Sequence, residues 1–314
     1  MSHTSRLLIC VLLLCAVCRA QTSPAGPQAA PQETDAGTTI KVNVKLVNVF
    51  ATVTDQNGAP VAGLTKEHFR VFEDDAPQQI AVFERESGLP LSVVMAIDAS
   101  LSTKKDLPLE LESARRFART ILRPIDGMSI VQFNEIVDEL QPFTSDQRRI
   151  ERAISRVRVG ASTALYDAIY LGAHALVPRQ GRKVIVVITD GGDTASRTGY
   201  QEALRSAQTS EAIIYAVIMV PIEASAGRDT GGEHALIQMS KDTGGKHYYA
   251  KSIQQLDHAF RQISEELRTQ YLIGYYPPKK AAGDFRRIRL EVASPDGSQR
   301  TARYRAGYFT SKLE

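Results

Sequence analysis

Cysteine is almost absent from this chain of 314 residues, and its three copies, Cys10, Cys15 and Cys18, all lie near the start. The rest of the chain can form no disulfide bond and no metal site with thiolate ligands. We therefore expect a domain that is held together by its apolar core alone.

The apolar run at the start of the chain, from Leu7 to Val17, is short. About 11 residues do not comfortably cross a bilayer of about 30 Å. Arg6 precedes the run and Ala20 follows it, which is typical of a secretory signal peptide over residues 1–20. We expect an exported protein, whether periplasmic, at the cell surface or secreted, that meets a membrane only through an uncleaved signal.

An excess of charge of one sign is absent as well. The net charge of the whole chain is +3, and without Arg6 and Arg19 there remain 36 basic and 35 acidic residues, a net charge of +1. Such a balance gives no global field that would attract nucleic acid. We expect no nucleic-acid partner.

Four regions follow the signal. Residues 21–37, rich in Pro, Ala, Gln and Gly, are expected to be a flexible linker. Apolar residues recur at period two over 38–87, which predicts a small β-rich segment. Over 88–270, strands alternate with helices, and strands alone return over 271–314.

The fold class predicted from this order is α/β. The apolar runs LSVVMAID and KVIVVITD are typical of strands buried on both faces, so 88–270 should form a doubly wound, mostly parallel sheet. The segment 271–314 is too small to be stable alone. We expect it to pair with 38–87 in a small β-sandwich that flanks the sheet or receives it as an insertion.

Two details of the sandwich are also predicted. The segment HFRVFEDDAPQQIAVFERE should form two strands around an acidic turn that contains Pro77. Near the C-terminus, ARYRAGYF should form one strand.

Oxygen-bearing side chains gather where strands or loops are predicted to end. Asp98, Ser100 and Ser102 follow the first buried strand, Thr163 precedes a helix, and Asp190 ends the second buried strand. The carboxyl ends of parallel strands meet at one edge of a sheet. Oxygen ligands alone suit a hard cation, Mg²⁺ or Mn²⁺, and the sequence therefore predicts a metal site there.

At these motifs the chain resembles a known family. The ordered pieces D-x-S-x-S, T-A-L-Y-D-A and I-T-D-G-G-D are the pattern of the metal-ion-dependent adhesion site (MIDAS) of von Willebrand factor type A (VWA) domains, and the flanking segments resemble the bacterial exported VWFA-related family. The resemblance implies direct contact of the metal with Ser100, Ser102 and Thr163. It implies that Asp98 and Asp190 act through bound water or by holding loops.

The chain departs from the family pattern at two positions, where Leu101 and Ser162 replace frequent glycines. Neither change removes an oxygen ligand. Three neutral hydroxyl ligands would leave the ion most of its charge, so it would seek an anionic oxygen. The expected partner is thus a protein that presents a carboxylate, in the manner of cell adhesion.

Residues in two loops beside the site are expected to contact this partner, because loops on a rigid sheet usually carry specificity. They are Asp193 and Arg197 in one loop, and Arg228 and Asp229 in the other.

Two other functions stay open. The metal could serve only to stabilise a structural or envelope-assembly subunit. A Mg²⁺-dependent hydrolase is disfavoured, because Ser100 stands where a phosphatase-type site has its second Asp, and a phosphate loop, G-x-G-x-x-G and H-E-x-x-H are missing. We therefore expect no enzyme, no catalytic residue and no small-molecule substrate.

Overall fold

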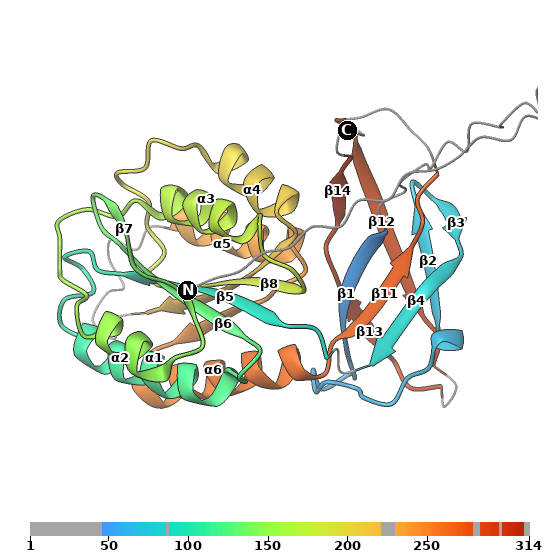
Figure 1. The fold of residues 1–314 in the computed structure, drawn as a ribbon, viewed down its shortest axis with the longest axis horizontal. Helices are drawn as coiled ribbons and strands as arrows, with labels where there is room; N and C mark the ends of the chain where they lie inside the picture. The colour runs from blue at the N-terminus through green and yellow to red at the C-terminus, as the bar shows by residue number, and fades with distance from the viewer. Residues whose placement is uncertain (1–45, 86–87, 221–229, 279–282, 295–296, 311–314) are drawn as a thin grey trace, which may run out of the picture. The chain divides into compact units, whose positions relative to one another are not determined.

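The computed structural model describes residues 46–310 apart from 86–87, 221–229, 279–282 and 295–296 (Figure 1). The predicted signal peptide and linker, and the first residues of the predicted β-rich segment, lie outside the described residues. Residues 44–314 belong to one compact unit. It contains a helix-covered sheet and two smaller antiparallel sheets.

A six-stranded sheet with the order β10-β9-β8-β5-β6-β7 is the centre of the α/β domain. Its strands are β5 (Leu91–Asp98), β6 (Gly127–Phe133), β7 (Val137–Thr144), β8 (Arg182–Thr189), β9 (Ala212–Met219) and β10 (His247–Ala250). All pairs are parallel except β6 with β7. The predicted doubly wound, mostly parallel sheet is confirmed.

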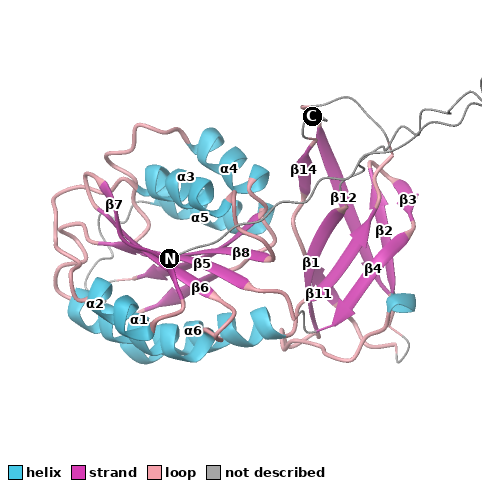
Figure 2. Ribbon diagram, in the orientation of Figure 1, coloured by secondary structure: helices cyan, strands magenta, loops and turns pink. Residues whose placement is uncertain are grey.

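Helices cover both faces of this sheet (Figure 2). One face carries α1 (Leu107–Ile121), α2 (Gln147–Ile154) and α6 (Ile253–Arg268), and the other carries α3 (Leu165–Leu176), α4 (Tyr200–Thr209) and α5 (Thr230–Asp242). Because both faces are covered, every residue of β5 is buried. Met95 packs in one core cluster and its neighbour Val94 in the other, which explains the unbroken apolar run.

The position of β5 fixes where the sheet can bind a ligand. It lies between β6 and β8, and the chain proceeds first towards β7 and later, from β8, towards β10 on the opposite side. The carboxyl ends of β5 and β8 therefore form the switch point of the sheet, where open α/β sheets bind ligands. No helix among the described residues has the length and apolar character that a membrane crossing requires.

The remaining strands form two four-stranded sheets with the orders β13-β1-β11-β4 and β14-β12-β2-β3. Their strands are β1 (Val47–Thr54), β2 (Phe69–Glu73), β3 (Ala76–Gln78), β4 (Ile80–Arg85), β11 (Tyr271–Tyr275), β12 (Phe285–Val292), β13 (Thr301–Arg303) and β14 (Gly307–Phe309), and a short 3-10 helix, η1, spans Lys66–His68. The N-terminal β1 pairs with β11, and β2 pairs with β12. The two ends of the chain thus share one sandwich, as predicted, and one apolar core joins residues such as Val49, Val71 and Ile273.

Two predicted strands are wrong in the same way. The strand expected after the acidic turn is two strands, since β3 pairs with β2 whereas β4 pairs with β11 of the other sheet. The strand expected over ARYRAGYF is also two, since β13 pairs with β1 and β14 with β12. The chain changes sheet within each segment. The alternating apolar pattern continues across the change of sheet, so the sequence pattern does not reveal where the change occurs.

The predicted acidic turn is present, but it does not contain Pro77. The turn residues are Asp74 and Asp75, which have φ values of +46° and +66°. Pro77 lies within β3, a strand at the edge of its sheet. An edge strand tolerates proline, because its outer side needs no N–H donor.

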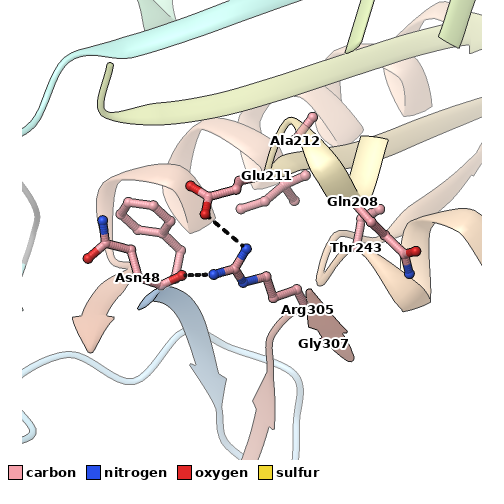
Figure 3. A pocket seen from close by; sticks show the side chains of 9 residues that line it. Asn48, Gln208, Glu211, Ala212, Thr243, Arg305 and Gly307 are labelled. Atoms are coloured by element: carbon pink, nitrogen blue, oxygen red, sulfur yellow. Dashed lines mark hydrogen bonds and ion pairs between the residues drawn. The ribbon is translucent and has the colours of Figure 1, made fainter. Parts of the chain in front are cut away.

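Charged side chains of the last strands bind the sandwich to the α/β domain. The Arg305 guanidinium forms an ion pair with Glu211 at 3.3 Å and donates a hydrogen bond to the Asn48 carbonyl at 2.6 Å (Figure 3). Arg303 pairs with Glu266 of α6, which also accepts a hydrogen bond from the Tyr248 hydroxyl at 2.9 Å. The cavity beside Arg305 is only about 10 Å³. It holds about one water at most, so the sandwich and the α/β domain pack closely here and leave no room for a ligand.

Gly245→Ala should destabilise the protein strongly. A Cβ at this position would lie 1.8 Å from the carbonyl oxygen of Ile214 in β9, and backbone cannot move aside cheaply. We expect a loss of about 2 kcal/mol or more in the free energy of unfolding, measured by urea denaturation. Gly88→Ala is the control, because no atom lies within 4 Å of its added Cβ. Equal stability of the two variants would contradict the close packing of this turn on β9.

Candidate functional site

The carboxylate of Asp98 is fixed at the end of β5. The side chain is fully buried, and its Oδ1 accepts a hydrogen bond from the Ser100 N–H at 2.9 Å. Its Oδ2 accepts a hydrogen bond from the Thr189 hydroxyl at 2.6 Å. Since Thr189 ends β8, this carboxylate joins the two strands at the switch point of the sheet.

The surroundings of Asp98 suit a cation. Burial raises the pKa of Asp98 to about 6, although the hydrogen bonds from Thr189 and Ser100 lower it, and the charge of Asp190 raises it further. In the absence of a cation, burial therefore disfavours the ionised form of the Asp98 carboxyl group. A nearby cation would stabilise that form.

Two serine hydroxyls lie side by side next to this carboxylate. The Ser100 Oγ is 3.0 Å from the Ser102 Oγ, with Ser100 buried and Ser102 exposed. The Thr103 hydroxyl lies 3.0 Å from the Ser100 carbonyl, to which it can donate, and this contact closes the loop. Leu101, between the serines, has 59% of its surface exposed, so its apolar side chain lies at the surface.

The loop that carries Thr163 is tied to the loop after β5. The N–H of Gly160 donates to the Ala99 carbonyl at 2.7 Å. A Cβ at position 160 would lie 2.5 Å from Cγ of Asn134, so only glycine allows this approach. The Glu135 carboxylate accepts a hydrogen bond from the Ala161 N–H at 2.6 Å and holds the same loop from the end of β6.

Thr163 is also tied to the loop after β8. Its N–H donates to the Thr194 hydroxyl at 3.0 Å, and its carbonyl accepts from the Thr194 N–H at 2.8 Å. Thr163 is 5% exposed, and Asp190 is half-buried. The structure thus brings together the three loops that carry the five residues predicted from the sequence.

Asp193 has an internal function. Its Oδ1 accepts hydrogen bonds from the N–H groups of Leu165 at 2.8 Å and Tyr166 at 3.3 Å, in the first turn of α3. Ala164 offers no side-chain cap there, so Asp193 supplies one from the neighbouring loop.

The structure says less about the other loop residues that were predicted to contact a partner. Arg197 is exposed, and its N–H donates to Asp167 at 3.1 Å. Arg228 and Asp229 lie outside the described residues. A contact of these residues, or of Asp193, with a partner stays a prediction.

Sequence reasoning missed two residues of this site. One is Thr189, whose hydroxyl also accepts a hydrogen bond from the Gly191 N–H at 3.1 Å and so connects Asp98 to the next loop. The other is Glu110 of α1, which is 2% exposed and whose Oε2 has no hydrogen-bond partner. Glu110 interrupts the apolar face of α1 between Leu107 and Ala114, a signal that the sequence contains.

Burial raises the pKa of Glu110 to about 8, and the charges of Asp98, Asp106 and Asp190 raise it further. Glu110 lines a cavity of about 250 Å³ that Ser102 and Asp190 also line. Within the described part of the chain, no three His, Cys, Asp or Glu side chains form a group that could hold a metal ion.

One solved structure with a TM-score above 0.5 shares this fold, and further structures are similar to parts of the chain. A von Willebrand factor type A protein from Catenulispora acidiphila has a TM-score of 0.51 and 12% identity, over 87% of this chain and 76% of its own. The conserved hypothetical protein BatB from Bacteroides thetaiotaomicron has a TM-score of 0.47 and 19% identity, over 57% of this chain and all of its own. The vWF domain of the type V pili tip protein Mfa5 from Porphyromonas gingivalis has a TM-score of 0.46 and 13% identity, over 56% of this chain and 94% of its own.

No curated protein shows significant similarity to the sequence. Residues 93–192, by contrast, match the family of the von Willebrand factor type A domain. The match begins in β5 and ends two residues after Asp190, so it contains all five predicted site residues. Over these residues, the α/β domain of this chain is therefore similar to the von Willebrand factor type A domain.

Proposed function

We propose that this protein is an exported binding module that recognises an acidic group of a protein partner through one Mg²⁺ or Mn²⁺ at a MIDAS-like site. The observation that carries the proposal is the pair of hydroxyls of Ser100 and Ser102, 3.0 Å apart, beside the buried carboxylate of Asp98. These are hard oxygen donors, and they lie within the part of the chain that matches the VWA family.

The residues divide into two roles in this proposal. Ser100, Ser102 and Thr163 would supply neutral hydroxyl ligands. Asp98 and Asp190 would act through bound water or by holding the loops, which agrees with the engagement of both Asp98 oxygens by Ser100 and Thr189. With neutral ligands, the bound ion offers positive charge to a carboxylate of the partner.

The chemistry supports binding more than catalysis. A phosphoryl-transfer site of this kind needs a nucleophile or a base beside the metal. Both oxygens of Asp98 already accept hydrogen bonds from within the protein, and the residue two positions later is a serine. Recognition of a partner needs neither group.

A structural role for the metal is the second candidate, and the Asp98–Thr189 hydrogen bond favours it. This bond joins the ends of β5 and β8, so a cation beside Asp98 would also stabilise the sheet edge. The two candidates differ in the effect of EDTA. Under recognition, EDTA abolishes the binding of a partner. Under a purely structural role, it lowers only the melting temperature.

Metal binding should depend on the predicted residues. We expect calorimetry to show one Mg²⁺ or Mn²⁺ site per chain in the wild type and none in Thr163→Val or Asp98→Asn, because these variants lose an oxygen ligand or a negative charge. Asp284→Asn is the control, since this carboxylate of the sandwich is 60% exposed and its loss makes the same change in charge. Wild-type affinity in both site variants would defeat the assignment.

Thr189 should position Asp98 for the metal. Thr189→Val keeps the shape of the side chain but removes the hydrogen bond to the Asp98 carboxylate, which is worth about 1.5–3 kcal/mol. We expect Mg²⁺ affinity to fall roughly tenfold or more while the fold persists. Thr120→Val, on the exposed face of α1, should leave affinity unchanged. An unchanged affinity in Thr189→Val would remove Thr189 from the site.

Capture of a partner should require both the metal and the hydroxyls. The protein without its first 37 residues is immobilised and exposed to envelope extract with Mg²⁺ or with EDTA. We expect bound proteins that are lost in EDTA and also lost with Ser102→Ala. A matched variant, Ser155→Ala, changes an exposed serine at the end of α2 and should retain them. Retention of the same proteins in EDTA would contradict metal-dependent recognition.

A further inference from the structure

The cavity beside the candidate metal site has an acidic wall. It measures about 250 Å³, and Asp106, Glu110 and Asp190 all line it. Glu110 is the unusual member, because it is 2% exposed and its Oε2 lacks a hydrogen-bond partner. A buried carboxylate without a partner is costly, so the native structure should supply one when the site is in use.

The rest of the wall contains hydroxyl and apolar residues and two cations of the chain itself, Lys105 and Lys251. Leu109 of α1, Met219 of β9 and Ile253 of α6 line the same cavity. An acidic group together with apolar walls suits a side chain that has an aliphatic stem and a cationic head. Lysine is such a side chain, since it buries its methylene groups against apolar surface and presents three N–H donors at its end.

We propose that this cavity binds a lysine side chain of the protein partner, with its ammonium group at Glu110 and its stem against Leu109 and Ile253. Ser102 and Asp190 line both this cavity and the candidate metal site, so the lysine would lie beside the partner's acidic group. The protein partner and that last placement rest on the proposed function. Binding of the lysine by the cavity stands on Glu110 and the walls alone.

A second divalent ion fits the cavity less well. Among the residues that the structure describes, no three acidic, histidine or cysteine side chains form a metal-holding group there or elsewhere. An ammonium group needs no such cage, because each of its N–H groups can donate to a separate oxygen. Its charge also complements the carboxyl groups of Asp106, Glu110 and Asp190, which outnumber the two lysines that line the same cavity.

The test uses Nα-acetyl-lysine amide as a probe, with Nα-acetyl-norleucine amide as its uncharged control. Amide chemical shifts of α1 and of residues 251–253 are followed by NMR at pH 8.5, where Glu110 is ionised because its pKa is about 8. We expect saturable shifts with the lysine probe and none with norleucine. Glu110→Gln should raise the dissociation constant roughly tenfold or more, because the ion pair and its charged hydrogen bond are lost.

Two further variants keep the test decisive. Asp106→Asn, at an exposed position that makes no side-chain cap, should weaken the lysine probe without touching the buried core. Glu112→Gln, on the exposed side of the same helix, should leave the affinity unchanged. The proposal is overturned by an absence of saturable shifts, as expected if Lys105 or Lys251 of the chain serves Glu110, or by equal affinity in wild type and Glu110→Gln.

The titration is run with Mg²⁺ and with EDTA. Lysine-probe binding in EDTA, in a protein that binds no Mg²⁺ under any condition, would end the proposed metal function and support the cavity. Mg²⁺ binding without any response to the lysine probe would end the proposal for the cavity and support the proposed metal site. The two failures are therefore distinguishable.

Discussion

A single hydrogen bond between the ends of two strands organises the functional edge of this protein. The Thr189 hydroxyl donates to the buried Asp98 carboxylate and accepts from the N–H of Gly191, so one side chain fixes β5, β8 and the loop that follows. The second loop, with Gly160 and Thr163, is attached by backbone hydrogen bonds to both of the others. This small network connects the three loops that carry the residues of the proposed site.

The same network explains which parts of the site the sequence could predict. Asp98, Ser100, Ser102 and Asp190 follow continuous apolar runs, and strands buried on both faces end at one sheet edge in a parallel fold. Thr189 was not predicted as a site residue because, in the sequence, it looks like the last residue of such an apolar run. Its function depends on a partner 91 positions away.

Glu110 and the changes of sheet in the sandwich are features that sequence patterns could not predict. An acid on the apolar face of α1 is visible in the sequence, but its meaning depends on the cavity that α1, β9 and α6 form together. The split between β3 and β4, and that between β13 and β14, depends on which sheet each half joins. Period-two alternation is the same in both sheets, so it cannot locate a crossing between them.

The pairing of β1 with β11 has a consequence for how the chain folds. Val47 meets Tyr275 in this pair, so the first strand of the sandwich must wait until the whole α/β domain has been made. Contacts between such distant segments form slowly, because a long loop must close before any contact stabilises it. Until then β1 and β2 expose unpaired edges and apolar faces, which are prone to aggregation.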